Sequence, residues 1–373
     1  MARYLFSSHD GYGLGHVRRN VLVAREILRH DRAAQVTLVT GVPRRPPWLI
    51  EQPGLDLVAV PPMLKDSDGS YRNATMSMQR AVAERARLFS ETVHRVQPDV
   101  VVVDRHPFGT AGELRPGLTA ARRSGAMIVL GLRDIIDEQD VVRQELATPG
   151  WHGVPDIFDE ILVYGDPSLC DQEAEYRLPM RPEYCGWVVE SPATAQTDDD
   201  LLVVSAGGGA DGAAVFQLGL GVVRLRPQLR AVLAAGPFAA EWGGDVLDAD
   251  PALAARVRLE RDGGATGDLL VGAGATMQMA GYNSTAESLV AGLRPVLVPR
   301  RTPRREQAIR AARLACLGLA DMVDESASPA EVSWLLDQPR RLAAGACERA
   351  GISFDGAARA AARLTAHTLA SAA

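Results

Sequence analysis

Residues 4–28 have the sequence YLFSSHDGYGLGHVRRNVLVAREIL, in which an apolar run, a glycine-rich turn and a helical pattern follow one another. This succession is typical of a β-strand that passes through a loop into an α-helix. Gly13 and Gly15 permit positive φ and a close approach of the backbone to a ligand. His16 stands at the expected helix start, where an imidazole either caps the helix or exchanges a proton near neutral pH. We expect this loop to bind a ligand or take part in catalysis.

The same alternation continues along the first half of the chain. Strands are predicted at residues 4–7, 36–40, 57–60, 100–103, 127–130 and 160–163, and helices at 17–29, 74–96 and 110–124. Residues 100–103 are four consecutive valines, as expected for a parallel strand buried on both faces. Strand–helix alternation predicts right-handed βαβ units around a parallel sheet.

A polar stretch, SPATAQTDDD at residues 191–200, separates the two halves and is expected to be a linker. Beyond it, strands are predicted at 201–205, 229–234, 257–260, 269–271, 277–279 and 296–298, and helices at 212–225, 284–291, 306–317 and 329–336. We therefore predict an α/β protein with two doubly wound, Rossmann-like domains, 1–190 and 201–354, facing a central cleft. Residues 355–373 are expected to form a helix that packs back on the first domain or makes a dimer contact.

Composition limits the classes of function. The chain has 373 residues, 47% of them apolar, and a net charge of −6, so no basic field favours nucleic acid. The four cysteines form no CxxC pair, which argues against a zinc site or a disulfide framework. Neither a signal peptide nor an apolar run of about 18 residues is recognisable. We expect a cytoplasmic protein with reduced thiols, and its oligomeric state is open.

A second glycine cluster, VSAGGGADG at residues 204–212, again lies between an apolar strand and a helix. Gly207, Gly208 and Gly209 leave backbone amides uncovered before a helix N-terminus, which suits a diphosphate, although a flexible turn has the same composition. The cluster is not a P-loop, because no GK[ST] follows. The N-terminal GYGLGH is not a dinucleotide fingerprint either, because it breaks the GxGxxG pattern.

A third motif, MAGYNSTAESLVAGLRPVLVPR at residues 279–300, starts at a strand end and enters a helix. The amides of Asn283, Ser284 and Thr285 are candidates for phosphate binding, and the carboxylate of Glu287 for ribose hydroxyls. Alternatively, Ser284 and Glu287 form a capping box, because they have the S-x-x-E spacing.

Together these motifs resemble those of the two-domain GT-B glycosyltransferases. GLGH, SAGGG and GYNSTAESLVAGLRPVLVPR…EQ are similar to the family 28 type, which includes the peptidoglycan N-acetylglucosaminyltransferase and plant galactolipid synthases. SSHDGYGLGHVRRN and KDSDGSYR are similar to a bacterial group of predicted glycosyltransferases. The resemblance implies an inverting transfer of a hexosyl or N-acetylhexosaminyl group from a nucleotide-diphosphate sugar, most often a UDP-sugar, to a hydroxyl of a small-molecule, glycan or lipid-linked acceptor. It implies no bound metal and no cofactor besides the donor.

The resemblance also implies roles on the donor side. Residues 281–288, GYNSTAES, would bind the diphosphate and, through Glu287, the ribose, with the triple glycine beside the phosphates. Arg261 would lie where a backbone amide contacts the base, and this bulky residue leaves the choice of base open. Glu306 and Gln307 would stand at the donor-sugar contacts, although the family more often has Asp or Gln in place of Glu306.

A transferase of this kind needs a base that takes the acceptor proton as the new C–O bond forms. We favour His16 for this role. Asp104, which follows the valine strand in VVVVDRHPFG, is its rival, unless it caps a loop or pairs with Arg105. His106 is a third candidate.

The acceptor side is expected to involve two loops. The resemblance implies that the loop containing Gly13 and Gly15 faces the acceptor and the reacting carbon. Residues 61–79 form a polar loop before a helix, and we expect Tyr71 and Arg72 to line the acceptor site. Residues 44–54, RRPPWLIEQPG, are expected to be a buried anchor rather than a contact with an anionic membrane surface.

Two other functions stay open at this point. A UDP-sugar 2-epimerase has the same fold, but it needs several carboxylates around the sugar, and only Glu287 and Glu306 stand out. A non-catalytic partner subunit that binds a sugar nucleotide is the second alternative. The intact glycine loops and His16 favour an active transferase.

Overall fold

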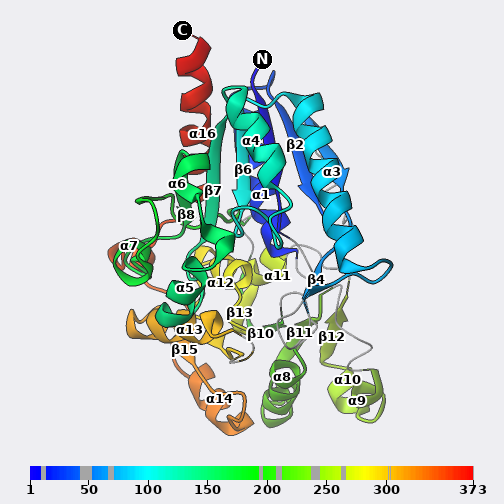
Figure 1. Ribbon diagram of the computed structural model, residues 1–373. Helices are drawn as coiled ribbons and strands as arrows, with labels where there is room; N and C mark the ends of the chain where they lie inside the picture. Colours follow the sequence, from blue (N-terminus) through cyan, green and yellow to red (C-terminus); the bar gives the residue numbers. More distant parts are fainter. Residues whose placement is uncertain are drawn as a thin grey trace. The chain divides into compact units, whose positions relative to one another are not determined.

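The computed structural model describes residues 1–9, 14–42, 53–65, 71–192, 196–206, 212–236, 244–261, 266–300, 302 and 304–372. The chain forms two compact units (Figure 1). The first comprises Met1–Val188 together with Ser353–Ala373, and the second comprises Val189–Ile352. Each unit is built around its own parallel sheet, and helices connect most of the described strands.

The first unit contains a seven-stranded parallel sheet with the strand order β3-β2-β1-β6-β7-β8-β9. Its strands are β1 (Arg3–Ser7), β2 (Gln35–Thr40), β3 (Leu55–Ala59), β6 (Val100–Asp104), β7 (Met127–Arg133), β8 (Glu160–Tyr164) and β9 (Pro182–Tyr184). The strand order reverses between β1 and β6. The carboxyl ends of these two strands therefore form a topological switch point, where open α/β sheets bind ligands.

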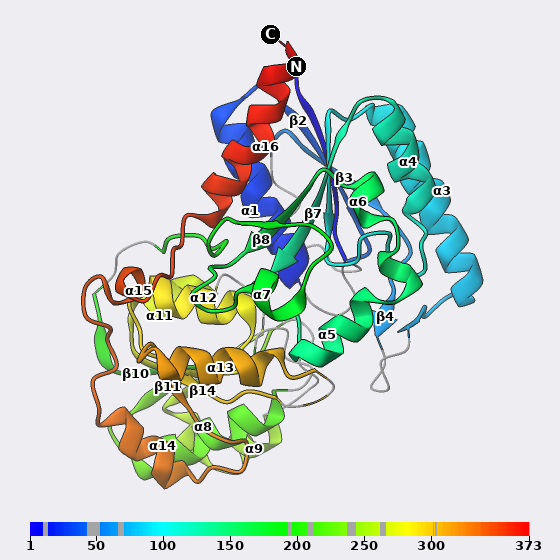
Figure 2. The ribbon, with the colours of Figure 1, turned by 60° about the vertical axis from the view of Figure 1, so that its left-hand side comes forward.

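Helices cover both faces of this sheet. They are α1 (Gly15–His30), α3 (Met78–Val96), α4 (Arg115–Arg123), α5 (Gln139–Leu146), α6 (Val154–Ile157), α7 (Gln172–Tyr176) and α16 (Gly356–Ala372), with a 3-10 turn at Pro149–Trp151. Figure 2 shows α1 beside α16 on one face and α3 beside α4 on the other. Among the helices of the described part of the chain, none has both the length and the apolar character that a membrane span requires.

The central strand β6 illustrates how the local sequence produces this sheet. Its four valines are each at most 1% exposed, because both faces of the sheet are covered. Burying such a side chain stabilises the fold by about 1.5–3 kcal/mol relative to leaving it in water. Asp104 ends the strand and is also buried, so the fold places a carboxylate at the switch point.

The second unit contains a six-stranded parallel sheet with the order β12-β11-β10-β13-β14-β15. Its strands are β10 (Asp198–Ser205), β11 (Arg230–Ala234), β12 (Val257–Glu260), β13 (Ala273–Gln278), β14 (Val296–Leu297) and β15 (Asp321–Met322). Its helices are α8 (Ala213–Leu225), α9 (Gly244–Asp248), α10 (Pro251–Ala254), α11 (Thr266–Val271), α12 (Tyr282–Val290), α13 (Glu306–Cys316), α14 (Pro329–Leu336) and α15 (Ala346–Arg349).

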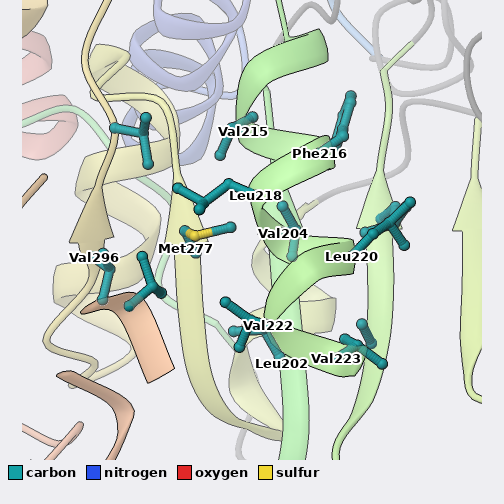
Figure 3. Close-up of a cluster of buried hydrophobic side chains, with 14 of the residues drawn as sticks. Leu202, Val204, Val215, Phe216, Leu218, Leu220, Val222, Val223, Met277 and Val296 are labelled. Carbon is teal, nitrogen blue, oxygen red and sulfur yellow. The ribbon is translucent and has the colours of Figure 1, made fainter. Parts of the chain in front are cut away.

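The core of the second unit forms where α8 packs on the sheet. Figure 3 shows the α8 side chains, among them Val222, against Val204 of β10, Met277 of β13 and Val296 of β14. A Cβ on Gly219 of α8 would lie 2.8 Å from a methyl group of Val204, so this glycine permits the close approach of helix and strand. This packing holds β10 and β13 side by side, and their carboxyl ends frame the candidate donor site.

Several features differ from the sequence prediction. Residues 269–271 are not a strand but the end of α11, because a short apolar run such as LLV fits a buried helix as well as a strand. β10 begins at Asp198, within the stretch expected to be a linker, and pairs there with Ala273 of β13. Strands β9 and β15 were not expected, and neither were two short strands at Leu64–Lys65 and Tyr71–Arg72 in the predicted polar loop, since two or three residues carry no recognisable period.

The chain returns to the first unit at Ser353. The Trp187 amide donates to the Ser353 carbonyl at 2.8 Å, and the Gly356 amide donates to the Trp187 carbonyl at 3.1 Å. Helix α16 then runs along α1, and Arg363 Nε donates to Glu160 Oε1 at 2.6 Å. The last helix of the chain is thus part of the first unit.

Candidate active site

His16 and Asp104, the two leading candidates for the base, form one hydrogen-bonded pair in the first unit. Asp104 ends β6, and His16 lies in the first turn of α1, the helix that follows β1. His16 Nδ1 lies 3.0 Å from Asp104 Oδ2. The Asp104 side chain is 1% exposed and that of His16 is 23% exposed, so the imidazole is the member of the pair that a substrate can reach.

Arg19 joins this pair from the same helix. Its Nη2 atom lies 2.8 Å from each carboxylate oxygen of Asp104 and 3.1 Å from His16 Nδ1. Its guanidinium carbon lies 5.1 Å from the centre of the Tyr164 ring, within cation–π range. Asn20 Nδ2 lies 3.5 Å from Asp104 Oδ2. Arg19 was not among the predicted site residues, although residues three apart in a helix share a face, so its spacing from His16 was a usable signal.

The Asp104 carboxyl stays ionised despite its burial. Burial on its own would raise the pKa, but the charges of Arg19 and His16 and their hydrogen bonds outweigh it and lower the pKa to about 2. The site therefore holds a fixed negative charge against the imidazole at every physiological pH. Such a carboxylate can orient a histidine and stabilise its protonated form.

The ring of His9 lies between the imidazole of His16 and two further polar rings, those of His106 and Tyr71. The His9 ring centre lies 6.0 Å from that of His16 and 4.3 Å from that of His106. His9 Nε2 lies 3.3 Å from the Tyr71 hydroxyl. Burial lowers the pKa of His9 well below its ordinary value, and the charges of His16 and Arg105 act in the same direction. His9 is therefore neutral at pH 7 and adds no charge beside the pair.

Arg105 fastens the end of β6 to α5. It has a left-handed backbone with φ of 73°, and its amide donates to the Gly131 carbonyl at 2.9 Å. Its two terminal nitrogens donate to the two carboxylate oxygens of Glu145, each at 2.8 Å. Left-handed backbone in a non-glycine residue costs of order 1 kcal/mol or more, and the two-pronged ion pair offsets that cost. His106, the third candidate base, is thereby held beside His9, with Nδ1 3.9 Å from Glu145 Oε1.

The described residues that were predicted to face an acceptor belong to helix α1 and to a short hairpin of the first unit. Gly15 is the first residue of α1. Tyr71 belongs to the hairpin formed by β4 (Leu64–Lys65) and β5 (Tyr71–Arg72), from which it reaches His9. Arg72 is exposed on the same hairpin. Gly13 and most of the stretch 44–54 lie outside the described residues, so the acceptor contacts stay a prediction.

In the second unit, α12 begins directly after Gly281, and the capping-box interpretation is therefore wrong. Gly281 is the N-cap, so Ser284 lies inside the helix, where its hydroxyl is 3.3 Å from the Gly281 carbonyl and 3.4 Å from that of Met279. The Thr285 amide donates to the Gly281 carbonyl at 3.0 Å and is thus engaged in the helix. Glu287 lies in the next turn and is buried.

Gln278, at the end of β13, holds the first turn of α12 in place. Its Nε2 atom donates to the Ser284 carbonyl at 3.0 Å, and its Oε1 atom accepts from the Ser288 hydroxyl at 3.0 Å. All three side chains are buried. The first turn of α12, which contains Asn283, is thereby fixed at the carboxyl end of the strand. Gln278 was not among the predicted site residues, because its position within the predicted strand 277–279 gives no sign of a polar role.

Glu306 and Gln307 open α13 and are both buried. Arg300 Nη2 donates to Glu306 Oε1 at 3.1 Å. Arg310, on the same helix and fully buried, donates to the Ala280 carbonyl at 2.6 Å and so connects α13 to the loop before α12. Sugar contacts of Glu306 and Gln307 stay a prediction.

The remaining donor-side residues are Arg261 and the triple glycine. Arg261 directly follows β12 and is exposed at the carboxyl end of the sheet. Gly207, Gly208 and Gly209 lie outside the described residues. Base and phosphate contacts therefore stay predictions for these positions.

Comparison of the sequence with protein-family models gives no match, and comparison with curated proteins gives none either. Solved structures match over the whole chain. The glycosyltransferase of kitacinnamycin has a TM-score of 0.63 at 15% identity, covering 100% of this chain and 98% of its own. MurG of Acinetobacter baumannii has a TM-score of 0.57 at 16% identity, covering 99% and 98%. A UGT transferase from Siraitia grosvenorii, solved in complex with UDP, has a TM-score of 0.61 at 14% identity, covering 99% and 100%. These likenesses show that the protein has the GT-B fold.

Proposed function

We propose that the protein is a glycosyltransferase that moves a hexosyl group from a nucleotide-diphosphate sugar to an acceptor hydroxyl. The observation that carries the proposal is the pair of His16 and Asp104, whose Nδ1 and Oδ2 atoms lie 3.0 Å apart at the switch point of the first sheet. The GT-B fold, and the UDP bound by one protein of that fold, support a donor of the UDP-sugar type.

In the proposed reaction, Nε2 of His16 removes the proton from the acceptor hydroxyl. The acceptor oxygen attacks the anomeric carbon of the donor as the bond from that carbon to the diphosphate breaks, and the electron pair leaves with the diphosphate. One displacement of this kind inverts the anomeric centre. The first turn of α12, with Asn283 and Ser284, stabilises the leaving group through the helix dipole and backbone amides, so the step requires no bound metal.

The donor contacts follow the predicted residues of the second unit. Glu287 accepts hydrogen bonds from the ribose hydroxyls, and Glu306 and Gln307 accept them from the sugar. Gly207–Gly209 add amides to the diphosphate, and Arg261 lies beside the base. The acceptor contacts involve the loop at Gly13 and Gly15 together with Tyr71 and Arg72.

The test combines nucleotide binding with turnover of the full chain. Among UDP, GDP and dTDP, the nucleotide that belongs to the donor should raise the melting temperature most, because it binds the native state alone. The matching sugar nucleotide should then be hydrolysed slowly without acceptor and consumed faster when an acceptor is present. Epimerised sugar nucleotide formed without acceptor would identify a 2-epimerase instead. Binding without any turnover would identify a non-catalytic subunit.

A further inference from the structure

Arg85 of α3 and Glu113, in the loop before α4, form an ion pair in the interior of the first unit. Their side chains are 7% and 0% exposed, and Arg85 Nε donates to Glu113 Oε1 at 3.2 Å. A buried ion pair is weak evidence for stability, because desolvation of the two charges offsets much of their attraction. The other hydrogen bonds of the two side chains lead to two separate loops, and these indicate what the pair does.

Glu113 fixes the loop that follows β6. Its carboxylate accepts from the amides of Thr110 and Ala111 at 3.3 and 2.8 Å. Gly109 passes close to the carboxylate, because it has φ of 83° and a Cβ there would lie within 2.6 Å of all three carboxyl atoms. The Gly109 amide donates to the His106 carbonyl at 3.0 Å. The turn that begins with His106 is therefore closed against Glu113.

Arg85 fixes the segment that leads into the hairpin of β4 and β5. Its Nη1 atom donates to the Pro61 carbonyl at 2.8 Å. The next carbonyl along the chain, that of Pro62, accepts from Asn73 Nδ2 at 2.7 Å. Asn73 directly follows β5, so the far strand of the hairpin, which contains Tyr71, is tied to the segment that Arg85 holds.

Side chains from the two loops meet at the ring of His9. The ring centre of His9 lies 4.3 Å from that of His106, and His9 Nε2 lies 3.3 Å from the Tyr71 hydroxyl. The same ring centre lies 6.0 Å from that of His16, the proposed base. A displacement of about 1 Å at a reacting group can lower a rate about 10²-fold, so the spacing of these loops matters for any group that reacts beside His16.

We propose that Arg85 is a positioning residue for the acceptor. Through its bonds to both loops it holds Tyr71 and His106 in place, and it thereby fixes where an acceptor hydroxyl is held beside His16. The inference rests on the proposed function, because it takes this part of the first unit to bind the acceptor. Its physical content, the dependence of two loops on one buried guanidinium, can be measured without turnover.

The first measurement is NMR of the full chain with labelled histidine and tyrosine rings, assigned by single replacements. Wild-type protein should show a contact between the His9 and His106 rings, and its absence overturns the proposal. The double variant Arg85→Met/Glu113→Gln removes both charges and keeps an oxygen for the loop amides, so we expect it to fold. Its ring contact should be weakened at least about twofold, and the Tyr71 ring signals should shift. Ring signals identical to those of wild type overturn the proposal.

The second measurement compares two rates of the active enzyme, with the sugar nucleotide and the acceptor that wild type uses. Transfer needs a positioned acceptor, whereas hydrolysis of the donor needs only water. The ratio of transfer to hydrolysis should therefore fall about 10–100-fold in the double variant. A loss of folded protein lowers both rates together and leaves the ratio unchanged.

The outcomes for the two proposals are distinct. An unchanged ratio in an active double variant overturns the inference and leaves the proposed function intact. A wild-type protein without any turnover contradicts the proposed function, and the ring signals then still decide whether the two loops depend on Arg85.

Two single variants complete the experiment. If the double variant does not fold, Arg85→Lys replaces it, because lysine keeps the charge opposite Glu113 but has one nitrogen in place of a rigid fork. It should show shifted ring signals and a lowered ratio, and wild-type values overturn the proposal. Arg87→Gln is the matched control, since Arg87 is an exposed arginine of the same helix paired with Glu84 and Glu91. An equal change in this control would also overturn the proposal.

Discussion

His16 Nδ1 lies 3.0 Å from Asp104 Oδ2, although 88 positions separate the two residues along the chain. Parallel pairing of β1 with β6 accounts for this proximity, because Ser7 near the end of one strand is in register with Val103 of the other. Helix α1 starts just beyond β1, and Asp104 is the last residue of β6. The topology of the sheet therefore brings the proposed base and a buried carboxylate together from two distant segments.

Replacement of His16 should separate catalysis from stability. We expect His16→Gln to lower kcat by about 10²–10⁴-fold, because a general base contributes that much, while the nucleotide-induced rise in melting temperature persists. Asp104→Asn should lower kcat at least about tenfold, since the ring loses its charged partner. Initial rates at saturating donor measure the kcat of both variants.

The control is His30→Gln, because His30 is an exposed histidine at the end of the same helix. If His16→Ala and His16→Gln retain near-normal turnover while Asp104→Asn has none, Asp104 is the base instead of His16.

The lowered pKa of Asp104 predicts a loss of stability in acid. The pKa is about 2 in the folded protein against an ordinary 3.8, so its contribution is fully present above about pH 4 and disappears as the pH falls toward 2. The difference corresponds to about 2 kcal/mol. Urea unfolding between pH 6 and pH 2.5 measures it.

The matching variants test that assignment. Asp104→Asn should be less stable than wild type at pH 6 and should lose this part of the acid dependence. Asp140→Asn, at an exposed position of α5, should change the unfolding free energy by no more than about 0.5 kcal/mol at either pH. An Asp104→Asn protein with the full acid dependence of wild type would show that other carboxyls cause it.

Gly131 should not tolerate a side chain. A Cβ at this position of β7 would lie 2.8 Å from the Tyr164 ring and its hydroxyl, and the same ring lies beneath the Arg19 guanidinium. We expect Gly131→Ala to lower the unfolding free energy by about 1–3 kcal/mol, because overpacking forces shifts in a close-packed interior. It should also lower kcat by displacing Arg19. Gly267→Ala, in α11 with no atom within 4 Å of the new methyl group, should be neutral or slightly stabilising. Equal effects of the two substitutions would contradict the packing argument.

Replacement of Gln278 should lower both the stability of the second unit and its affinity for the donor nucleotide. Gln278→Met removes the hydrogen bonds to the Ser284 carbonyl and the Ser288 hydroxyl, which fix the first turn of α12. We expect a loss of about 1–3 kcal/mol in unfolding free energy and a roughly tenfold weaker affinity for UDP by calorimetry. Gln338→Met, at an exposed position, should change neither. If the Gln278→Met protein is destabilised but binds UDP as tightly as wild type, the first turn of α12 does not contribute to diphosphate binding.

Local patterns predicted most of the fold. The valine run of β6, the alternation of strands and helices, and its restart after residue 200 depend on neighbouring residues alone. They predict two parallel sheets. Prediction failed where the local signal was ambiguous. Residues 269–271 are apolar enough for a strand, but they end a helix. The spacing of Ser284 and Glu287 suits a capping box, but Gly281 is the N-cap of this helix. In each case the chain outside the motif determines where the helix begins or ends.

The residues alone predict that a glycine-rich loop follows the first strand of each half, and they make His16, Asp104 and His106 the candidates for taking a proton. The folded chain shows in addition that His16 and Asp104 form one pair, and that Arg19 donates to the carboxylate of Asp104. The physical reason is the strand order: β1 and β6 are neighbours through main-chain hydrogen bonds that no local pattern specifies, and the charges at their carboxyl ends meet only once the sheet has formed.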